Sequence, residues 1–212
     1  MGQRRIPLQT GNFYHVYNRG NNRQIIFFER ENYIYFLRLI REHLIKNSVD
    51  IIAYCLMPNH YHLLVYLRDE TLSDAMKSLS LSYTKAINKR FNRSGVLFQG
   101  RFQSIHISQT DYLVNLSQYI HLNPVKASLV KQPEEWEFSS YLEYAGLRKG
   151  TIPKIEYIKM QIEEESVYQQ FLADHNLPHS SDFKKTATRF RIDRRIDPRL
   201  LKEVGDLNPY NQ

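Results

Sequence analysis

Cysteine is nearly absent from this chain of 212 residues. Because Cys55 has no second cysteine to pair with, the sequence excludes an intramolecular disulfide and a zinc site made of several thiolates. No apolar run approaches the roughly 20 residues that a membrane-spanning helix needs. The N-terminal segment contains basic side chains but no apolar stretch, so we expect no secretory signal peptide. These shortages predict a cytoplasmic, nucleoid-associated protein without a membrane partner.

Acidic residues are outnumbered by basic ones. Lys and Arg total 29 against 22 for Asp and Glu, which gives a net charge of +7, and 13% of the residues are aromatic. Basic side chains can neutralise phosphates and aromatic rings can stack on exposed bases, so a nucleic-acid partner is the first expectation. An ordinary, slightly basic enzyme is the alternative at this stage. A hydrophobic content of 42% is typical of a globular protein and argues against wholesale disorder.

Periodic hydrophobic patterns predict an α+β domain. Alternation indicates strands over residues 11–20, 50–56, 60–67 and 102–108, and helical spacing indicates helices over residues 31–47 and 72–91. Met57, Pro58 and Asn59 predict a turn between the second and third strands, and Thr71 with Asp74 has the spacing of a capping box. The order βαββαβ is that of a ferredoxin-like antiparallel sheet with both helices on one face.

Two regions follow this unit. A helix over residues 110–122 is expected to stop at Asn123-Pro124, because a residue before proline disfavours the α conformation. A short helix over 139–145 and a linker over 146–153 are weaker expectations. The chain therefore divides into a domain over residues 1–150 and a helical or irregular C-terminal extension over 151–212.

The extension changes sign along its length. Acidic residues dominate 156–174, whereas 184–202 contains eight Lys or Arg against two Asp, and includes Arg194 and Arg195. We expect the basic part to act as a clamp on DNA, since it could neutralise several phosphates. The alternative is a solvated helix followed by a loosely ordered basic tail.

The segment MPNHYHLLV contains the most informative pair of residues. On a strand, residues i and i+2 point to the same face, so His60 and His62 present two imidazoles side by side while Tyr61 and Leu63 point outward on the other face. Two nitrogens at that spacing can share one divalent cation. The alternative is a pair of half-buried histidines that bond to their neighbours.

A metal site needs a third protein ligand, and the sequence has no cysteine cluster and no His-Glu-x-x-His helix. Tyr119 and Asn123 are four residues apart on a predicted helix, so they lie on one side of it. Tyr119 could be a nucleophile with Asn123 steering the metal. Alternatively, Tyr119 packs beside Tyr112 and Asn123 simply ends the helix.

Five blocks now show a resemblance to a known family. In chain order, GNFYHVYNRGNN, MPNHYHLLV, GRFQSI, YIHLNPVKASLV and EEWEFSSYLEYAG resemble the REP-associated tyrosine transposases, a branch of the single-tyrosine HUH transposases. The resemblance covers about residues 11–146 and implies that residues 1–150 are an HUH single-tyrosine transposase domain. It implies that His60, His62 and Asn123 bind the metal and that Tyr119 is the nucleophile.

Three features depart from the family pattern. Tyr61 stands between the two histidines, where an aliphatic residue is usual, and Asn123 stands where the insertion-sequence branch usually carries glutamine. Residues after about 150 match no block.

The resemblance implies a metal-dependent transposase and endonuclease that acts on single-stranded, hairpin-forming DNA. It would cleave and rejoin DNA through a covalent 5′-phosphotyrosine intermediate. One phosphodiester is exchanged for another, so no nucleotide cofactor is expected. Imidazoles alone would suit several transition metals, but the family implies Mg²⁺ or Mn²⁺. Relatives imply either a monomer or a homodimer.

Polar and basic side chains outside the catalytic set are candidates for DNA recognition. They lie in the loop after the first strand, before the fourth strand, on the helix over 72–91 and in the tail. The candidates are Asn18, Arg19, Asn21, Asn22, Arg23, Lys85, Lys89, Arg90, Arg101, Arg194 and Arg195.

Two functions from other classes compete with this interpretation. An RNA-recognition binding module shares the βαββαβ order and the basic charge, but its aromatic strand signature is missing and it has no use for paired histidines. A catalytically silent DNA-binding protein is the second, although the sequence retains all four catalytic positions.

Overall fold

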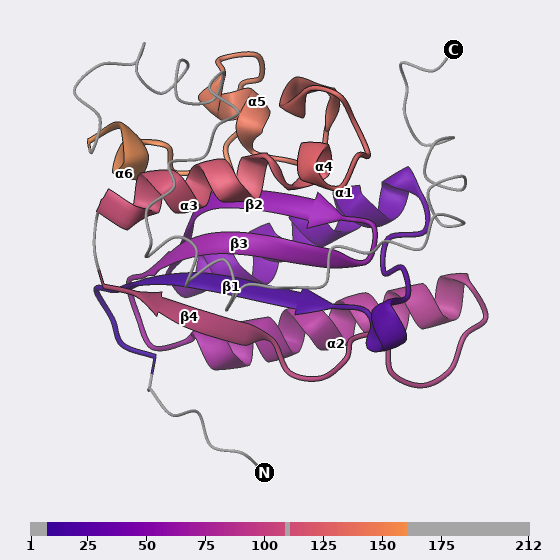
Figure 1. Ribbon diagram of the computed structural model, residues 1–212. Helices are drawn as coiled ribbons and strands as arrows, with labels where there is room; N and C mark the ends of the chain where they lie inside the picture. Colours follow the sequence, from indigo (N-terminus) through magenta and orange to yellow (C-terminus); the bar gives the residue numbers. More distant parts are fainter. Residues whose placement is uncertain (1–7, 109–110, 161–212) are drawn as a thin grey trace.

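The computed structural model describes residues 8–108 and 111–160 (Figure 1). A four-stranded antiparallel sheet has the strand order β2-β3-β1-β4. Its elements in chain order are β1 (Phe13–Arg19), α1 (Arg30–Leu39), β2 (Val49–Met57), β3 (His60–Leu67), α2 (Leu72–Arg90) and β4 (Gln103–Ile107). This order confirms the predicted ferredoxin-like α+β fold.

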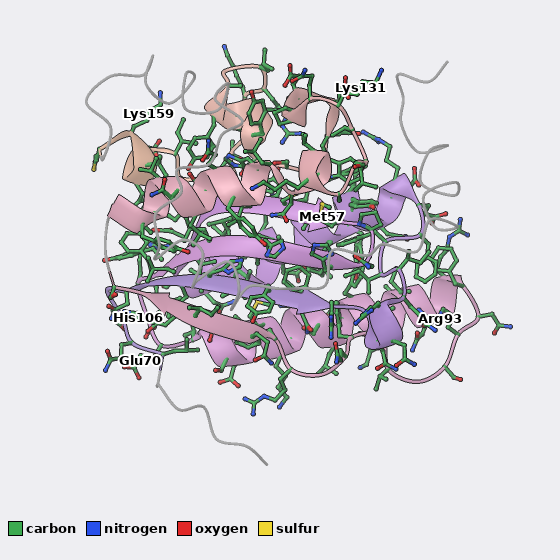
Figure 2. All side chains as sticks on the ribbon, in the orientation of Figure 1. Met57, Glu70, Arg93, His106, Lys131 and Lys159 are labelled. Atoms are coloured by element: carbon green, nitrogen blue, oxygen red, sulfur yellow. The ribbon has the colours of Figure 1, made fainter. Side chains whose placement is uncertain are left out.

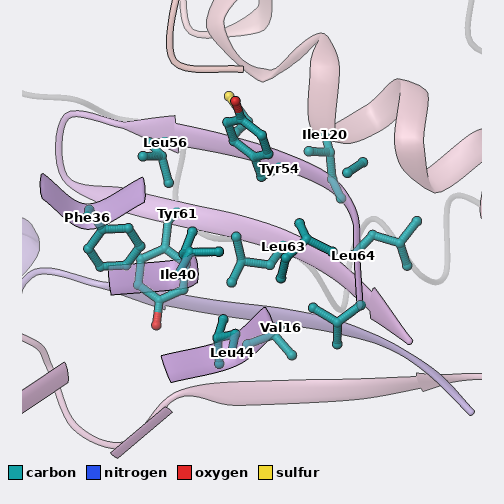
Figure 3. Packing of buried hydrophobic residues seen from close by; sticks show 14 of the residues in the cluster. Val16, Phe36, Ile40, Leu44, Tyr54, Leu56, Tyr61, Leu63, Leu64 and Ile120 are labelled. Atoms are coloured by element: carbon teal, nitrogen blue, oxygen red, sulfur yellow. The ribbon is translucent and has the colours of Figure 1, made fainter. Parts of the chain in front are cut away.

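The two helices of the split unit cover one face of the sheet. Phe36 of α1 lies 5.0 Å, between ring centroids, from Tyr61 of β3 and 4.9 Å from Tyr83 of α2. Figure 3 shows Phe36, Ile40 and Tyr61 packed together on this side. Tyr61 lies on the face opposite the histidines, as predicted, but it is fully buried and not directed outward. The face opposite the histidines is covered by helices, and an aromatic ring fills that space.

A second helical layer covers the other face over β2 and β3. It is formed by α3 (Asp111–His121), whose buried residues include Leu113, Leu116 and Ile120. The predicted end of this helix at Asn123-Pro124 is confirmed, since α3 ends at His121. A second helix, α4 (Asn123–Lys126), starts at once, with Pro124 in its first turn, where the missing N–H costs nothing. Asn123 is therefore the first residue of a new helix.

Two helix predictions need correction. The helix expected over 31–47 leaves α geometry after Leu39: a π-helical turn covers Ile40–Leu44 and a 3-10 turn covers Ile45–Asn47. Thr71 does not form the predicted capping box, because its hydroxyl donates to the Asn47 carbonyl at 2.5 Å. The start of α2 is thereby tied to the end of the preceding helical segment.

Residues after α4 pack along the outer edge of β2. The short helical segments here are a 3-10 turn (Pro133–Glu135), α5 (Tyr141–Tyr144) and α6 (Glu156–Lys159). The segment predicted as a linker reaches the sheet, because Pro153 forms a parallel bridge with Ile51 and the Tyr157 hydroxyl donates to Asp50. The first ten residues of the predicted extension thus belong to the packed structure, whereas Arg194 and Arg195 lie outside the described residues.

None of the helices in the described part of the chain combines the length and the apolar composition required to cross a membrane.

Candidate active site

Strand pairing collects the site residues on one face of the sheet. Directly paired residues of antiparallel strands share a face, and the register pairs Tyr17 with His62 and Arg19 with His60. His15 lies two residues before Tyr17 and so joins them. This is the face that α3 covers over β2 and β3. The predicted histidine pair therefore faces the predicted nucleophile helix.

His60 is arranged as a neutral imidazole with one nitrogen available. Its Nδ1 lies 2.6 Å from Asn59 Oδ1, and an amide oxygen only accepts, so Nδ1 carries the proton and Nε2 has a lone pair. Burial, followed by the positive charge of Arg19, lowers the pKa of His60 to about 4. A neutral ring with its second nitrogen held by an amide or carboxyl oxygen is the usual state of a metal-binding histidine.

His62 is more deeply buried and has an orphaned nitrogen. Burial, and then the neighbouring His15 and His60, hold its pKa well below the usual range. Its Nδ1 lies 2.9 Å from His15 Nε2, while its Nε2 is buried without a hydrogen-bond partner among the described residues. The rings of His60 and His62 are 5.1 Å apart and nearly perpendicular. A buried nitrogen without a partner is costly unless something binds it.

Helix α3 brings the predicted nucleophile to these histidines. The Tyr119 ring lies 5.9 Å, between centroids, from the His62 ring in an edge-on arrangement, and Tyr119 is only 5% exposed. The Nζ atom of Lys126, which is the last residue of α4, lies 5.1 Å from the centroid of the Tyr119 ring. The phenol is therefore shielded from water and lies close to an imidazole and an ammonium group.

Asn123 is held by the helix that carries Tyr119. Its Nδ2 donates to the Tyr119 carbonyl at 2.8 Å and makes a longer contact with the Ile120 carbonyl at 3.4 Å. The side chain thus satisfies the C-terminal carbonyls of α3. Because Nδ2 is used in this way, Oδ1 is the atom that Asn123 can offer to a cation.

The donor set fits a divalent ion that keeps several oxygen ligands. Within residues 8–108 and 111–160, no three His, Cys, Asp or Glu side chains form a cluster that could hold a metal ion. Two imidazole nitrogens and one amide oxygen would remain, and phosphate or water oxygens would have to complete the coordination. Mg²⁺ and Mn²⁺ accept such a shared set. The orphaned Nε2 of His62 is the feature that favours a ligand here.

Three loops meet at the end of the sheet next to His60. The Gly20 amide donates to the Asn59 carbonyl at 2.8 Å, the Asn21 amide to the Leu97 carbonyl at 2.8 Å, and the Gln99 amide to the Arg19 carbonyl at 2.9 Å. Figure 2 shows Met57 towards this end, and Glu70 with His106 at the opposite one. Exposed side chains on these loops include Asn22, Arg23 and Arg101. The predicted recognition loops are therefore adjacent to the site.

Asn18 does not lie with these exposed residues. It pairs with Tyr61 and so lies on the face opposite the histidines, where it is 5% exposed and its Nδ2 donates to the Gly100 carbonyl at 3.0 Å. In this structure it ties β1 to the loop before β4. A contact with bases would require this bond to break, so its placement does not favour the predicted DNA contact.

The basic residues of α2 are also remote from the histidine face. Lys85, Lys89 and Arg90 are exposed on a helix that packs against the opposite face of the sheet. Arg90 forms an ion pair with Glu29 at 3.1 Å. The sequence placed these residues on one helix, but it could not show which face of the sheet that helix would cover.

The sequence prediction missed three residues of the site. Alternation over the strand predicted for residues 11–20 puts His15 and Tyr17 on one face, yet only the pairing register shows that this face is the one that carries His62. Lys126 lies in the block YIHLNPVKASLV, and its approach to Tyr119 depends on the close succession of α3 and α4. Its position two helical turns after Tyr119 was a signal that could have been used.

Comparisons with known proteins find relatives of this chain. A family model described as Transposase IS200 like matches residues 9–123. An Escherichia coli K12 protein named REP-associated tyrosine transposase is 26% identical over 156 residues, which cover 71% of this chain and 87% of that protein. A Haemophilus influenzae protein provisionally assigned the same name is 30% identical over 103 residues, which cover 43% of this chain; this chain spans only 58% of that relative's length.

A solved structure has the same fold. It is described as a REP-associated tyrosine transposase bound to a REP hairpin, and it matches with a TM-score of 0.60 at 20% sequence identity, covering 73% of this chain and 98% of the other.

Proposed function

The chain belongs to the IS200-like transposase family, and on that premise we propose that it is a metal-dependent transposase that cleaves and rejoins single-stranded, hairpin-forming DNA through a covalent bond to Tyr119. The observation that carries this proposal is the approach of the Tyr119 ring to His62, whose buried Nε2 has no hydrogen-bond partner among residues 8–108 and 111–160. The DNA substrate is proposed from the relatives named for REP sequences and from the neighbour described with a REP hairpin.

The chemical step is a transesterification. The Oη of Tyr119 forms a bond to the scissile phosphorus as the bond from phosphorus to the 3′ oxygen breaks, which leaves a 5′-phosphotyrosine and a free 3′-OH. The phenol loses a proton and the departing 3′ oxygen gains one, so the protons balance. Because the number of phosphodiester bonds is unchanged, a 3′-OH can reverse the step on the same or another strand without a nucleotide cofactor.

His60 Nε2, His62 Nε2 and Asn123 Oδ1 are the atoms that would hold the divalent ion. When bound, Mg²⁺ or Mn²⁺ would polarise a phosphate oxygen and stabilise negative charge on the leaving oxygen. Burial keeps both imidazoles neutral and therefore able to donate lone pairs. Asn59 orients His60 through the 2.6 Å bond to its Nδ1.

The surroundings of Tyr119 suit a reaction with an anion. Lys126 places a positive charge 5.1 Å from the centroid of the Tyr119 ring. This charge would stabilise the negative charge of a phosphate bound next to Tyr119. Arg19 is close enough to His60 to lower its pKa and lies at the same end of the sheet as the exposed Arg23 and Arg101. These arginines would bind the DNA backbone beside the scissile phosphate.

The test is a covalent-capture experiment. The full-length protein is incubated with an end-labelled DNA hairpin and either Mn²⁺ or Mg²⁺, and the products are separated on a denaturing gel. We expect a labelled protein band that is lost with EDTA and lost in Tyr119→Phe, while Tyr119→Phe still binds the hairpin. Tyr112→Phe is the matched control on the same helix and should retain the band.

Two further outcomes bear on the assignment. His60→Ala and His62→Ala should each remove metal-dependent cleavage, because two remaining protein ligands hold the ion too weakly. Wild-type protein that binds the hairpin but forms no covalent product with either metal would identify a silent DNA-binding protein instead. A band that persists in Tyr119→Phe and disappears in Tyr112→Phe would move the nucleophile to Tyr112.

A further inference from the structure

His15 is a buried histidine that the proposed chemistry does not use. It is fully buried in the central strand β1, and its ring is nearly parallel to that of His62, with centroids 5.0 Å apart and an interplanar angle of 14°. The Nε2 of His15 lies 2.9 Å from Nδ1 of His62. A buried pair of imidazoles joined in this way needs a reason beyond packing, because an apolar side chain would fill the same space.

One proton is shared across this contact. Two neutral imidazoles can bond only if one nitrogen donates and the other accepts. If His62 Nδ1 donates, then His62 Nε2 has a lone pair that can bind a cation. If His15 Nε2 donates instead, the proton of His62 is on Nε2, which points into a buried space with no described hydrogen-bond partner. This second arrangement blocks metal binding at His62, whereas the first, which places the proton of His15 on its buried Nδ1, leaves the Nε2 lone pair of His62 available for a cation.

The position of His15 excludes it as a further ligand. Its Nε2 contacts Nδ1 of His62, which is the nitrogen on the other side of the ring from the orphaned Nε2. His60 has the same arrangement with a different partner, since Asn59 Oδ1 holds its Nδ1. Each of the two candidate ligands therefore has one nitrogen held by a neighbouring side chain and one left for a ligand.

We propose that His15 is a positioning residue that accepts the Nδ1 proton of His62 and so holds the Nε2 lone pair of His62 towards the divalent metal. This inference rests on the metal site proposed above and adds a residue to it. Partners that fix the tautomer and ring direction of a metal-binding histidine typically change metal affinity by about 10- to 100-fold when they are removed. His15 would contribute through His62 and would not touch the metal or the DNA.

The first measurement uses unaltered protein. A long-range proton–nitrogen NMR spectrum of the metal-free protein at neutral pH reports which nitrogen of each neutral imidazole carries the proton, and His62 is assigned by the loss of its signals in His62→Gln. We expect His62 to be protonated on Nδ1. Protonation on Nε2 would overturn the role of His15, whether or not any His15 variant folds.

The second measurement uses two variants and Mn²⁺ as the probe. His15→Phe keeps a ring but removes the acceptor, whereas His15→Gln supplies an amide oxygen that can accept from His62. Titration of Mn²⁺ followed by electron paramagnetic resonance should show binding about 10- to 100-fold weaker in His15→Phe and largely restored in His15→Gln. Equal Mn²⁺ affinity in wild type and folded His15→Phe would overturn the proposal. Wild-type protein that binds no Mn²⁺ would instead contradict the metal site itself, and the NMR result would still decide the tautomer.

Discussion

The Nζ of Lys126 lies 5.1 Å from the centroid of the Tyr119 ring. These residues belong to different helices, α3 and α4, which are separated only by Leu122. An ammonium group over an aromatic face is attractive, and in a shielded site its charge acts strongly on nearby anions. The arrangement gives the proposed nucleophile a fixed positive neighbour.

Replacement of Lys126 by glutamine should therefore slow formation of the covalent protein–DNA product by about 10- to 100-fold. Hairpin affinity should change much less, because the arginines proposed to bind the DNA backbone would remain. Lys126→Arg retains the charge and should keep most of the rate. Single-turnover gel assays at saturating DNA measure the rate, and fluorescence anisotropy measures affinity. A wild-type rate in Lys126→Gln would show that the ammonium group plays no part in the reaction.

Gly20 should tolerate no side chain. A Cβ at this position would lie 2.0 Å from the Gln24 carbonyl oxygen, so the loop over residues 20–24 would have to move. We expect Gly20→Ala to lower the free energy of unfolding by about 1–3 kcal/mol and to weaken hairpin binding. Gly100→Ala is the matched control in the adjoining loop, because its Cβ would meet nothing within 4 Å. Thermal unfolding and anisotropy with a labelled hairpin compare the two variants. If both variants have the same stability and the same hairpin affinity, the loop over residues 20–24 is not sensitive to a Cβ at Gly20.

Acid should destabilise the metal-free protein from about pH 6.5 downward. Burial lowers the pKa of His15 and of His121 to about 3 and that of His60 to about 4, and it also lowers the pKa of His62. The unfolded chain takes up these protons near pH 6.5 while the folded chain does not, so unfolding is favoured as pH falls. Each histidine should contribute on the order of 1 kcal/mol per pH unit between about pH 6.5 and 4.

His121→Gln tests this pH dependence away from the proposed metal ligands. His121 is fully buried and bonds the Ser140 hydroxyl at 2.8 Å, and a glutamine amide can make a similar bond without titrating. Urea unfolding in EDTA at several pH values should show a shallower loss of stability in this variant than in wild type. An unchanged slope would mean that another group controls the acid response.

The basic tail should clamp DNA that flanks the cleavage site. Because Pro153 and Tyr157 pack on the sheet, the informative truncation follows Met160 and not residue 150. Removal of residues 161–212 should weaken hairpin binding and flatten its salt dependence, yet preserve covalent capture at saturating DNA. The full-length double variant Arg194→Ala, Arg195→Ala should reduce the salt slope by roughly one to two. A truncated protein with unchanged affinity and salt slope would eliminate the clamp.

The sequence was sufficient to predict the order of the elements and the two pairs of site residues. Period-two alternation placed His60 beside His62, and helical spacing placed Tyr119 close to Asn123, because the members of each pair are only a few residues apart along the chain. Relationships between elements were not accessible in the same way. The contact between His15 and His62 depends on strand register, and the burial of Asn18 and Tyr61 depends on which face the helices cover.

Helix ends were the other source of error. The residues around Leu39 and Thr71 have ordinary helical composition, yet tertiary contacts decide where the α geometry ends and begins. The same is true of α4, since Pro124 permits either a loop or a new helix after Asn123. Local propensity does not decide where these helices begin and end, and contacts such as the bond from Thr71 to the Asn47 carbonyl do.

The loops beside His60 are joined to one another by their main chains. The bonds from Gly20 to Asn59, from Asn21 to Leu97 and from Gln99 to Arg19 all run between backbone amides and carbonyls. Such bonds do not depend on the identity of the side chains, so an exposed position such as Arg101 can change without altering the loop framework. Target preference could therefore diverge among descendants of this protein by substitution at a few loop positions, while the histidine strand and the tyrosine helix stay the same.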